Sequence, residues 1–338
     1  MTRHGTSFSN SNILEHFVGD WRNIEKMGSL TVSQIPIIDF SDENMKPGTD
    51  TWFSASQVLR SAVESHGCFY AMTNEISMEL FNSVFALMKE LFDLPLETKN
   101  QKTSEKPNHG YYPRIPKAPL YESVGIDLDG STNEEAIQMF ANKMWPKGYD
   151  HFCEAINLYA KLLVEMDRTA KRLLFDAYGL DKRDCDSLLE STNYMFRSFK
   201  YLVPHKTQNT LGLYAHTDSS YFTIIHQNNV AGLQVKLKTG EWVDTDPSHC
   251  MFVFLAGDAL KVWSNDRIQS CEHRVIMWEE KERYSMGLLS YNRKKVQTHE
   301  EMIDEKHPSR YKEFNHYEYI NLRSKFPPQE EISNFILL

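Results

Sequence analysis

Apolar residues recur along this chain with two patterns, one typical of amphipathic helices and one typical of short strands. The helical pattern comes first along the chain. Two amphipathic helices are predicted near residues 50–66 and 77–92. The apolar face of the second consists of Leu80, Val84, Met88 and Leu91. A longer helix is predicted over 148–178, where Gly179 suits the C-cap. Its stripe, Ile156, Tyr159, Leu163, Met166, Ala170 and Leu174, is typical of a helix packed on a core.

From residue 193 onward, short apolar or aromatic segments alternate with turn residues. These segments read YMFRSFKYL, YFTIIHQ, GLQVKL, EWVDT, MFVFLAG, HRVIMW and RYSMGLLSY. Many short strands at regular spacing predict an antiparallel barrel or sandwich. One further strand, IPIIDF, is predicted at 35–40. We therefore expect a mainly β fold with flanking helices, in which a largely helical N-terminal half surrounds a C-terminal barrel.

These patterns divide the chain into four regions. We expect residues 1–34 to form a mobile N-terminal extension and residues 35–190 a mostly helical region. The β core should span 191–296, and a helical lid should follow over 297–338. Within the second region, the Pro- and Tyr-rich stretch 104–123 has no clear periodicity and predicts a loop.

Composition narrows the classes of partner. The 338 residues are 41% hydrophobic and 25% charged, with a net charge of −9, and no dense Lys/Arg patch favours nucleic acid. No apolar run approaches the length of a membrane span, and the N-terminus lacks the apolar core of a signal peptide. Five widely spaced cysteines favour a reducing compartment. We expect a cytoplasmic monomer that binds a small molecule.

One short stretch, YAHTDSS at 214–220, carries a candidate metal site. In a strand, residues i and i+2 point to the same face, so His216 and Asp218 can project together. The 2-His-1-carboxylate triad of non-haem Fe(II) enzymes needs one more histidine and leaves positions open. His273, which begins the apolar segment HRVIM, is the natural third ligand.

Other histidines are less suitable as ligands. The pairs His299-x-Glu301 and His316-x-Glu318 have the right residue types, but they lie in charged, helix-like sequence, where i and i+2 diverge. We expect both pairs to be solvated surface groups. His226 and His249 lie on or beside predicted strands, and a structural role is expected for each.

A second candidate site follows in RYSMGLL, where Arg283 and Ser285 share a face. A guanidinium that points into an apolar barrel is costly unless an anion meets it. Arginine suits a carboxylate because it can donate two parallel hydrogen bonds, and the serine hydroxyl adds a third donor. The alternative is a buried arginine paired with an aspartate or glutamate of the chain.

At this point the sequence resembles the plant 2-oxoglutarate- and Fe(II)-dependent dioxygenases, from about Ile35 onward. The resemblance lies in IPIIDF, LGLYAHTD, GLQV, FVFLAGDALKVWSN, HRV and RYSMG. Within that superfamily, which includes isopenicillin-N-synthase-like enzymes, FRSFKY and RYSMGLLSY look most like the branch containing the glucosinolate side-chain dioxygenases and auxin oxidases.

The resemblance implies a double-stranded β-helix, or jelly roll, for 191–296. It implies that His216, Asp218 and His273 bind Fe(II), and that Arg283, Ser285 and Tyr201 hold the distal carboxylate of 2-oxoglutarate. O2 would be the second co-substrate, with ascorbate as reductant. Many members carry Asn two residues before that tyrosine, where this chain has Phe199, which puts one contact in doubt.

The implied reaction oxidises a C–H bond of a small plant metabolite, by hydroxylation, ring closure or desaturation, with succinate and CO2 as co-products. Aromatic residues predicted to line the substrate pocket are Tyr111, Tyr121, Tyr214, Phe222 and Phe254. Core packing is the alternative role for each of them. The lid segment would face Phe314, Tyr317 and Ile320 inward. Two alternative functions are an oxidase of the same fold that does not consume 2-oxoglutarate and a non-catalytic cupin-like binding protein.

Overall fold

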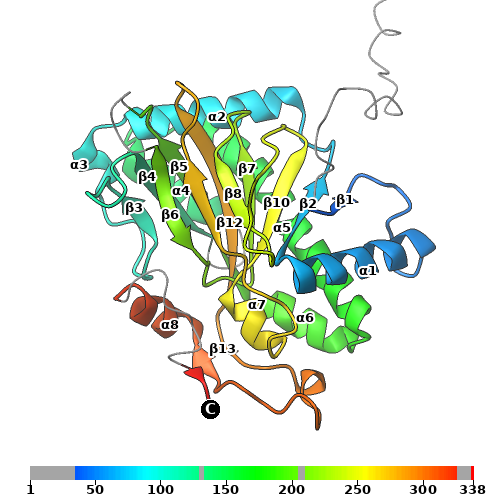
Figure 1. The fold of residues 1–338 in the computed structure, drawn as a ribbon. Helices are drawn as coiled ribbons and strands as arrows, with labels where there is room; N and C mark the ends of the chain where they lie inside the picture. The colour runs from blue at the N-terminus through cyan, green and yellow to red at the C-terminus, as the bar shows by residue number, and fades with distance from the viewer. Residues whose placement is uncertain (1–34, 129–132, 205–209, 326–335) are drawn as a thin grey trace, which may run out of the picture. The chain divides into compact units, whose positions relative to one another are not determined.

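Two β-sheets and a layer of helices build the region from Ile35 to Leu338 (Figure 1). The computed structural model describes residues 35–128, 133–204, 210–325 and 336–338. The predicted extension 1–34 therefore lies outside the described residues. Among these residues, no helix combines the length and the apolar character needed to cross a membrane.

The larger sheet has eight strands and runs through the centre of this unit. Its strands, in spatial order, are β1 (Ile37–Asp39), β2 (Cys68–Met72), β10 (Met251–Ala256), β7 (Phe222–Gln227), β12 (Arg283–Asn292), β5 (Thr192–Tyr201), β4 (Tyr121–Leu128) and β3 (Gly110–Tyr112). Only the β1–β2 pair among them is parallel, and the others are antiparallel. The sheet therefore brings strands from both halves of the sequence together.

The smaller sheet carries two of the three predicted metal ligands, His216 and His273. Its strands, in spatial order, are β6 (Leu211–His216), β11 (His273–Ile276), β8 (Leu233–Lys236) and β9 (Trp242–Asp244). A separate pair joins β13 (Lys295–Val296) to β14 (Phe314–Asn315). Each segment predicted as a strand beyond residue 193 forms one. Within the described residues the two main sheets are not hydrogen-bonded into a closed barrel, so the expected barrel is a two-sheet jelly roll.

Helices account for most of the remaining secondary structure. They are α1 (Asp50–Ser65), α2 (Met78–Asp93), α3 (Leu96–Lys99), α4 (Asn133–Met144), α5 (Asp150–Tyr178), α6 (Lys182–Ser191), α7 (Asp258–Trp263), α8 (His316–Arg323) and the 3₁₀ turn η2 (Glu300–Met302). The three predicted helices are confirmed. Thr49 and Ser77 cap the N-termini of α1 and α2, and Gly179 ends α5 with φ of 69°.

The stretch 104–123, predicted as a loop, contributes to the larger sheet. Strand β3 pairs with β4, whose first residues belong to the same stretch, and β4 pairs with β5 along its whole length. Local periodicity could not reveal these strands, because their hydrogen-bond partners come from distant sequence. Strand β2 and helices α4 and α6 were likewise not predicted.

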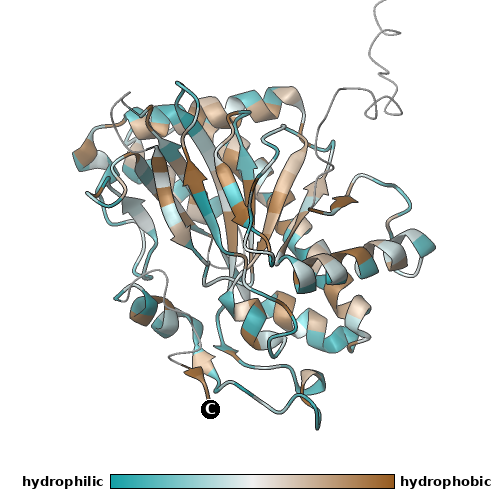
Figure 2. Cartoon of the chain, in the orientation of Figure 1, coloured by the Kyte–Doolittle hydropathy of each residue, from teal (hydrophilic) through white to brown (hydrophobic). Residues whose placement is uncertain are grey.

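Side-chain alternation gives the larger sheet two different faces. Along β12, Met286 and Leu288 pack in the core shared with the helices, whereas Arg283 and Ser285 point between the two sheets. Helices α1, α2, α4 and α5 cover the first face, and the smaller sheet lies across the second (Figure 1). Hydrophobic and hydrophilic residues are mixed along the helices and along several strands (Figure 2), as expected of elements that each have one buried side.

His316 corrects one expectation, because it is fully buried and not a solvated surface group. Its Nε2 donates to the carbonyl oxygen of Ser219 at 2.6 Å, and its Nδ1 accepts from the Asn292 amide at 2.9 Å. The helical period placed Glu318 on the exposed side but could not show what lies under the first turn of α8. His299, with Asp184 at 3.5 Å, is only partly buried, and Glu301 is exposed.

His226 fills a structural role in the helix-facing core. The Tyr159 hydroxyl lies 2.6 Å from its Nδ1, and its Nε2 lies 2.9 Å from the His249 carbonyl oxygen. Phe252 stacks on its ring with centroids 4.1 Å apart. Burial lowers the pKa of His226 to about 3, so the folded protein holds this ring neutral.

This lowered pKa predicts a loss of stability in acid. The unfolded chain takes up a proton on His226 below its ordinary pKa near 6.5, while the folded chain does not until pH falls toward about 3. Between pH 7 and 5 the group should cost about 2 kcal/mol of the free energy of unfolding. Urea unfolding of metal-free protein should therefore show a smaller acid-dependent loss for His226→Gln than for the wild type. Equal acid-dependent losses of stability in the two proteins would contradict the view that His226 is held neutral in the folded state.

Candidate active site

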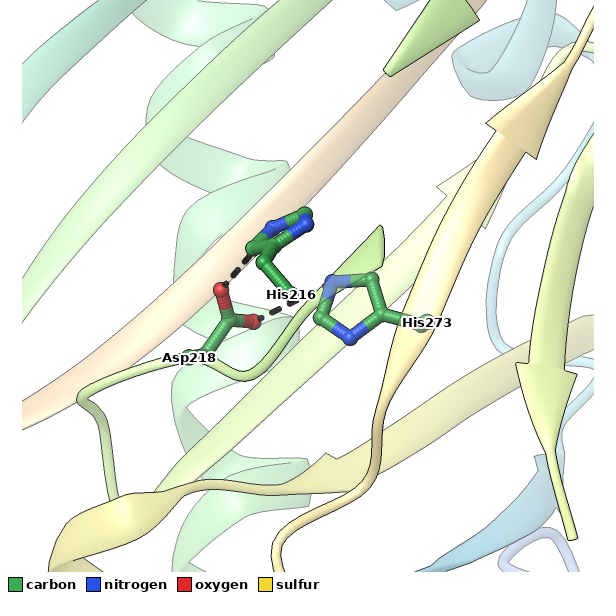
Figure 3. A group of neighbouring side chains, drawn as sticks. All are labelled: His216, Asp218 and His273. Carbon is green, nitrogen blue, oxygen red and sulfur yellow. Dashed lines mark ion pairs between the residues drawn. The ribbon is translucent and has the colours of Figure 1, made fainter. Parts of the chain in front are cut away.

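Three side chains converge at one place, two from the end of β6 and the loop after it and one from the start of β11 (Figure 3). One ligand atom each from His216, Asp218 and His273 lies within 4.8 Å of the others. The two Nε2 atoms lie 3.6 and 3.7 Å from opposite oxygens of the Asp218 carboxylate. His216 and His273 are direct partners in the β6–β11 ladder. The sheet register therefore sets the two rings side by side, with centroids 4.3 Å apart.

Backbone carbonyls fix the orientation of both imidazoles. Nδ1 of His216 lies 2.9 Å from the Tyr214 oxygen, and Nδ1 of His273 lies 3.0 Å from the Cys271 oxygen. Since a carbonyl only accepts, each Nδ1 carries the proton and donates it, and each Nε2 keeps a free lone pair toward Asp218. Nitrogen and carboxylate donors in this arrangement suit a first-row divalent metal.

The loop after β6 holds Asp218, which corrects the expectation that strand alternation alone would place it. Strand β6 ends at His216, and the Asp218 carbonyl accepts a 2.8 Å hydrogen bond from the Asp258 amide at the start of α7. Gly257 makes this approach possible, because a Cβ there would lie 2.1 Å from the Ser220 oxygen. The α7 turn and the loop thus fix the carboxylate together.

Electrostatics favours the protonation states that a metal needs. Burial, together with the nearby His273, lowers the pKa of His216 to about 4, so its imidazole is neutral at pH 7. Burial opposes ionisation of Asp218. The two imidazoles and a hydrogen bond from Thr223 outweigh it, however, and the pKa of Asp218 falls below its ordinary value. A neutral imidazole and an ionised carboxylate are the forms that coordinate metal.

Arg283 lies buried in the same space and is 1% exposed. Its Nη2 donates to Oε1 of Gln227 at 2.8 Å and its Nη1 to the Ser285 hydroxyl at 3.2 Å, while its guanidinium carbon lies 4.9 Å from the Tyr201 ring centre. Among the described residues none of these partners is a carboxylate, so a chain-internal ion pair does not compensate the charge. Burial lowers the pKa of Arg283, as expected of a desolvated cation.

A cavity of about 370 Å³ connects the cluster of His216, Asp218 and His273 with Arg283. It is lined by all six predicted metal and 2-oxoglutarate residues, His216, Asp218, His273, Arg283, Ser285 and Tyr201. Of the predicted substrate residues, Tyr121 and Tyr214 line it, as does Ile320 of α8. Phe314 and Tyr317 of the predicted lid face are partly buried, but they are not among the lining residues.

Three predicted substrate residues lie elsewhere. Phe222 and Phe254 are fully buried in the helix-facing core, where Phe254 stacks on Phe69 with centroids 4.6 Å apart. The cavity side of β7 carries Thr223 and Ile225 instead. Both phenylalanines were assigned to the wrong face, because an all-apolar strand gives no signal about which side faces which core.

Tyr111 also points away from the cavity. Its hydroxyl donates to Glu122 at 2.7 Å, and Glu122 in turn forms a buried ion pair with Lys99 at 3.1 Å. The neighbouring Tyr112 lines the cavity. The alternation of β3 decides between the two tyrosines, and β3 was not predicted.

Several lining residues were missed although the sequence held a signal for them. Tyr201 was assigned to the site, and Phe199 and Arg197 lie two and four residues before it on the same strand β5. Tyr291 shares the cavity face of β12 with Arg283 in the same way. For Gln227 the sequence held no signal of a role in the site, because only the pairing of β7 with β12 places this residue beside Arg283 and Ser285.

Comparison with known proteins agrees with this geometry. Residues 192–290 match the model of the 2OG-Fe(II) oxygenase superfamily, and residues 35–148 match that of the non-haem dioxygenase N-terminal region. The chain belongs to the 2OG-Fe(II) oxygenase superfamily. It is 38% identical over 296 residues to an Arabidopsis thaliana protein, "Probable 2-oxoglutarate-dependent dioxygenase AOP1.2", covering 85% of this chain and 90% of that one.

Other relatives and solved structures support the same membership. The 2-oxoglutarate-dependent dioxygenase AOP3 of A. thaliana is 29% identical, with 87% of this chain and 94% of AOP3 covered. The rice dioxygenase for auxin oxidation superposes with a TM-score of 0.76 at 26% identity, over 90% of this chain and all of that one. Its A. thaliana counterpart in a 2-oxoglutarate complex gives 0.72 at 28%, over 81% and 99%. The chain is thus a 2-oxoglutarate-dependent dioxygenase with the jelly-roll fold.

Two adjacent tyrosines provide a test of which face of β3 meets the substrate. Tyr112→Ala should raise the KM for the organic substrate several-fold and leave the melting temperature nearly unchanged, because this side chain lines the cavity and is partly exposed. Tyr111→Ala should lower the free energy of unfolding by about 2 kcal/mol, because a buried carboxylate loses its donor, and should leave that KM unchanged. The opposite pattern would show that the faces are reversed.

Proposed function

We propose that this dioxygenase oxidises a C–H bond of a small plant metabolite in the cavity between the sheets, with His216, Asp218 and His273 as the Fe(II) ligands. The observation that carries the proposal is the convergence of these three ligand atoms within 4.8 Å in a cavity that also contains a buried arginine without a carboxylate partner among the described residues. The auxin-oxidising structural neighbours and the AOP relatives support a plant metabolite as substrate.

The residues of the triad have complementary tasks in this proposal. His216 and His273 present neutral Nε2 atoms, and Asp218 supplies the anionic oxygen that offsets part of the metal charge. Fe(II), bound together with 2-oxoglutarate and O2, would supply the oxidising power to break a substrate C–H bond, with succinate and CO2 as co-products. Hydroxylation, ring closure and desaturation can all begin from that step.

Arg283, Ser285 and Tyr201 would hold the distal carboxylate of 2-oxoglutarate. The Gln227 amide accepts from Arg283, and its own nitrogen donates to Thr245 at 3.0 Å, so the guanidinium is held in one orientation before an anion arrives. A preoriented buried arginine loses little side-chain entropy on binding. Ascorbate would act as the reductant.

Helix α8 would close the substrate side of the cavity as the lid. His316 ties its first turn to Ser219, next to Asp218, and the Tyr319 hydroxyl donates to Asp258 at 3.3 Å. Ile320, Arg323 and Ser324 of this segment reach the cavity. These hydrogen bonds connect α8 to the loop that holds Asp218, and a lid held there would help to exclude water from one side of the site.

Removal of the carboxylate ligand tests the metal assignment. Asp218→Ala should lower Fe(II) affinity and turnover by more than about 100-fold, because one of three protein ligands is lost. The melting temperature of the metal-free protein should change little. Metal content per chain after dialysis against Fe(II) is the measurement, and His299→Ala, from a His-x-Glu pair outside the cavity, is the matched control. Full metal content in Asp218→Ala would refute the assignment.

Substitution of Arg283 tests the co-substrate pocket. Arg283→Lys keeps the charge but loses the two parallel N–H donors of the guanidinium. The KM for 2-oxoglutarate should therefore rise about 10- to 100-fold. Arg274→Lys is the control, because Arg274 stacks on Trp242 on the outer side of the smaller sheet, 4.1 Å from the ring centre. Product formation without any 2-oxoglutarate would support the oxidase alternative. If the protein, loaded with Fe(II) and 2-oxoglutarate, binds small molecules but releases no succinate with any of them, the result would support the alternative of a non-catalytic binding protein.

A further inference from the structure

A second guanidinium, that of Arg197, lies in the same cavity and has no task in the mechanism above. Arg197 is 7% exposed and lines the cavity from β5. Its polar contacts are all to neutral groups of the described residues: the Ser123 hydroxyl at 2.9 Å, the Asn108 carbonyl oxygen and the Met195 sulfur. Its Nε is buried and has no hydrogen-bond partner among the described residues. A buried cation that keeps an unused donor, and that forms no ion pair within the described part of the chain, favours an anionic ligand.

The strands beside Arg197 leave room for its side chain. Its partner on β4 is Gly125, and its partner on β12 is Gly287. A Cβ at Gly125 would lie only 3.2 Å from Nη2 of Arg197, so a larger residue would crowd the guanidinium. The Tyr112 ring also packs near the guanidinium, with its centre 5.2 Å from the guanidinium carbon. The glycines on both neighbouring strands and the Tyr112 ring therefore define one position for the Arg197 side chain.

The charge balance of the loaded site leaves Arg197 uncompensated. The charges of Fe(II), the Asp218 carboxylate, 2-oxoglutarate and Arg283 cancel. Arg197 then remains as a positive charge in the cavity lining. A substrate with one negative charge would restore neutrality in a site of low dielectric. The tyrosines of the lining, Tyr112, Tyr121 and Tyr291, suit an aromatic or apolar body for that substrate.

We propose that Arg197 anchors a carboxylate of the organic substrate, so that the enzyme acts on an organic acid with an aromatic or apolar body. This inference rests on the proposed function, because it assumes that Arg283 is occupied by 2-oxoglutarate. Arg197 sets the substrate's orientation: with the carboxylate at β5, the body of the acid extends toward the metal triad, where its C–H bond is oxidised.

Binding of matched acids and amides tests this proposal without turnover. The probes are phenylacetate, 3-phenylpropanoate, 4-phenylbutanoate and 2-naphthylacetate, each with its neutral primary amide. They are titrated calorimetrically into protein loaded with Mn(II) and saturated with 2-oxoglutarate, so that Arg283 is already occupied. At least one acid should bind about tenfold or more tightly than its amide, because a charge-assisted hydrogen bond is lost in the amide. If no acid is preferred over its amide, the proposal is wrong.

Variants assign the preference to one side chain. Arg197→Gln should abolish the preference for that acid and leave 2-oxoglutarate affinity unchanged, and Arg197→Lys should restore part of it. The control Arg183→Gln removes the same charge from an exposed position, 89% accessible, and should keep the preference. If Arg197→Gln weakens acid and amide equally, or only lowers the melting temperature, Arg197 merely tethers Asn108 and Ser123 and the proposal is overturned. Unchanged 2-oxoglutarate binding in that case leaves the proposed function intact.

Discussion

The two-residue alternation of side chains along the larger sheet is the constraint on which the site depends. One face must be apolar, because helices α1, α2, α4 and α5 pack on it, and residues such as Phe222, Phe254 and Met286 fill that core. The other face is then free to carry Arg283, Ser285 and Arg197 toward the smaller sheet. A slip of one residue in β12 or β5 would exchange the two sets and bury these charges against the helices.

Buried positive charge is tolerated here because rigid neutral groups hold it in place. Gln227 and Ser285 orient Arg283, while Ser123 and the Asn108 backbone orient Arg197. Neither set neutralises the cation, so each guanidinium keeps its affinity for an anion from solution. A buried guanidinium without an anion costs folding stability, and the proposed anionic ligands would offset that cost.

In the proposed metal triad, strand pairing positions two ligands and a loop positions the third. Register in the β6–β11 ladder aligns His216 with His273, and carbonyls of the same strands fix their tautomers. Asp218 instead depends on a loop that is held by the α7 turn, whose Gly257 lies against Ser220. The same loop meets His316 of the lid helix. The proposed metal site and the proposed lid are therefore connected through one loop.

The sequence by itself determined the helices with strong periodicity, the strands beyond residue 193 and the residue types of the proposed site, because motifs such as His216-x-Asp218 and Arg283-x-Ser285 are local. It did not determine which of Tyr111 and Tyr112 faces the cavity, that Phe222 and Phe254 belong to the helix-facing core, or that His316 is buried. Those outcomes depend on strand pairing and on packing between elements far apart in the chain. Only the tertiary structure decided them, since an apolar strand or a short helix has no local signal for the partner it will meet.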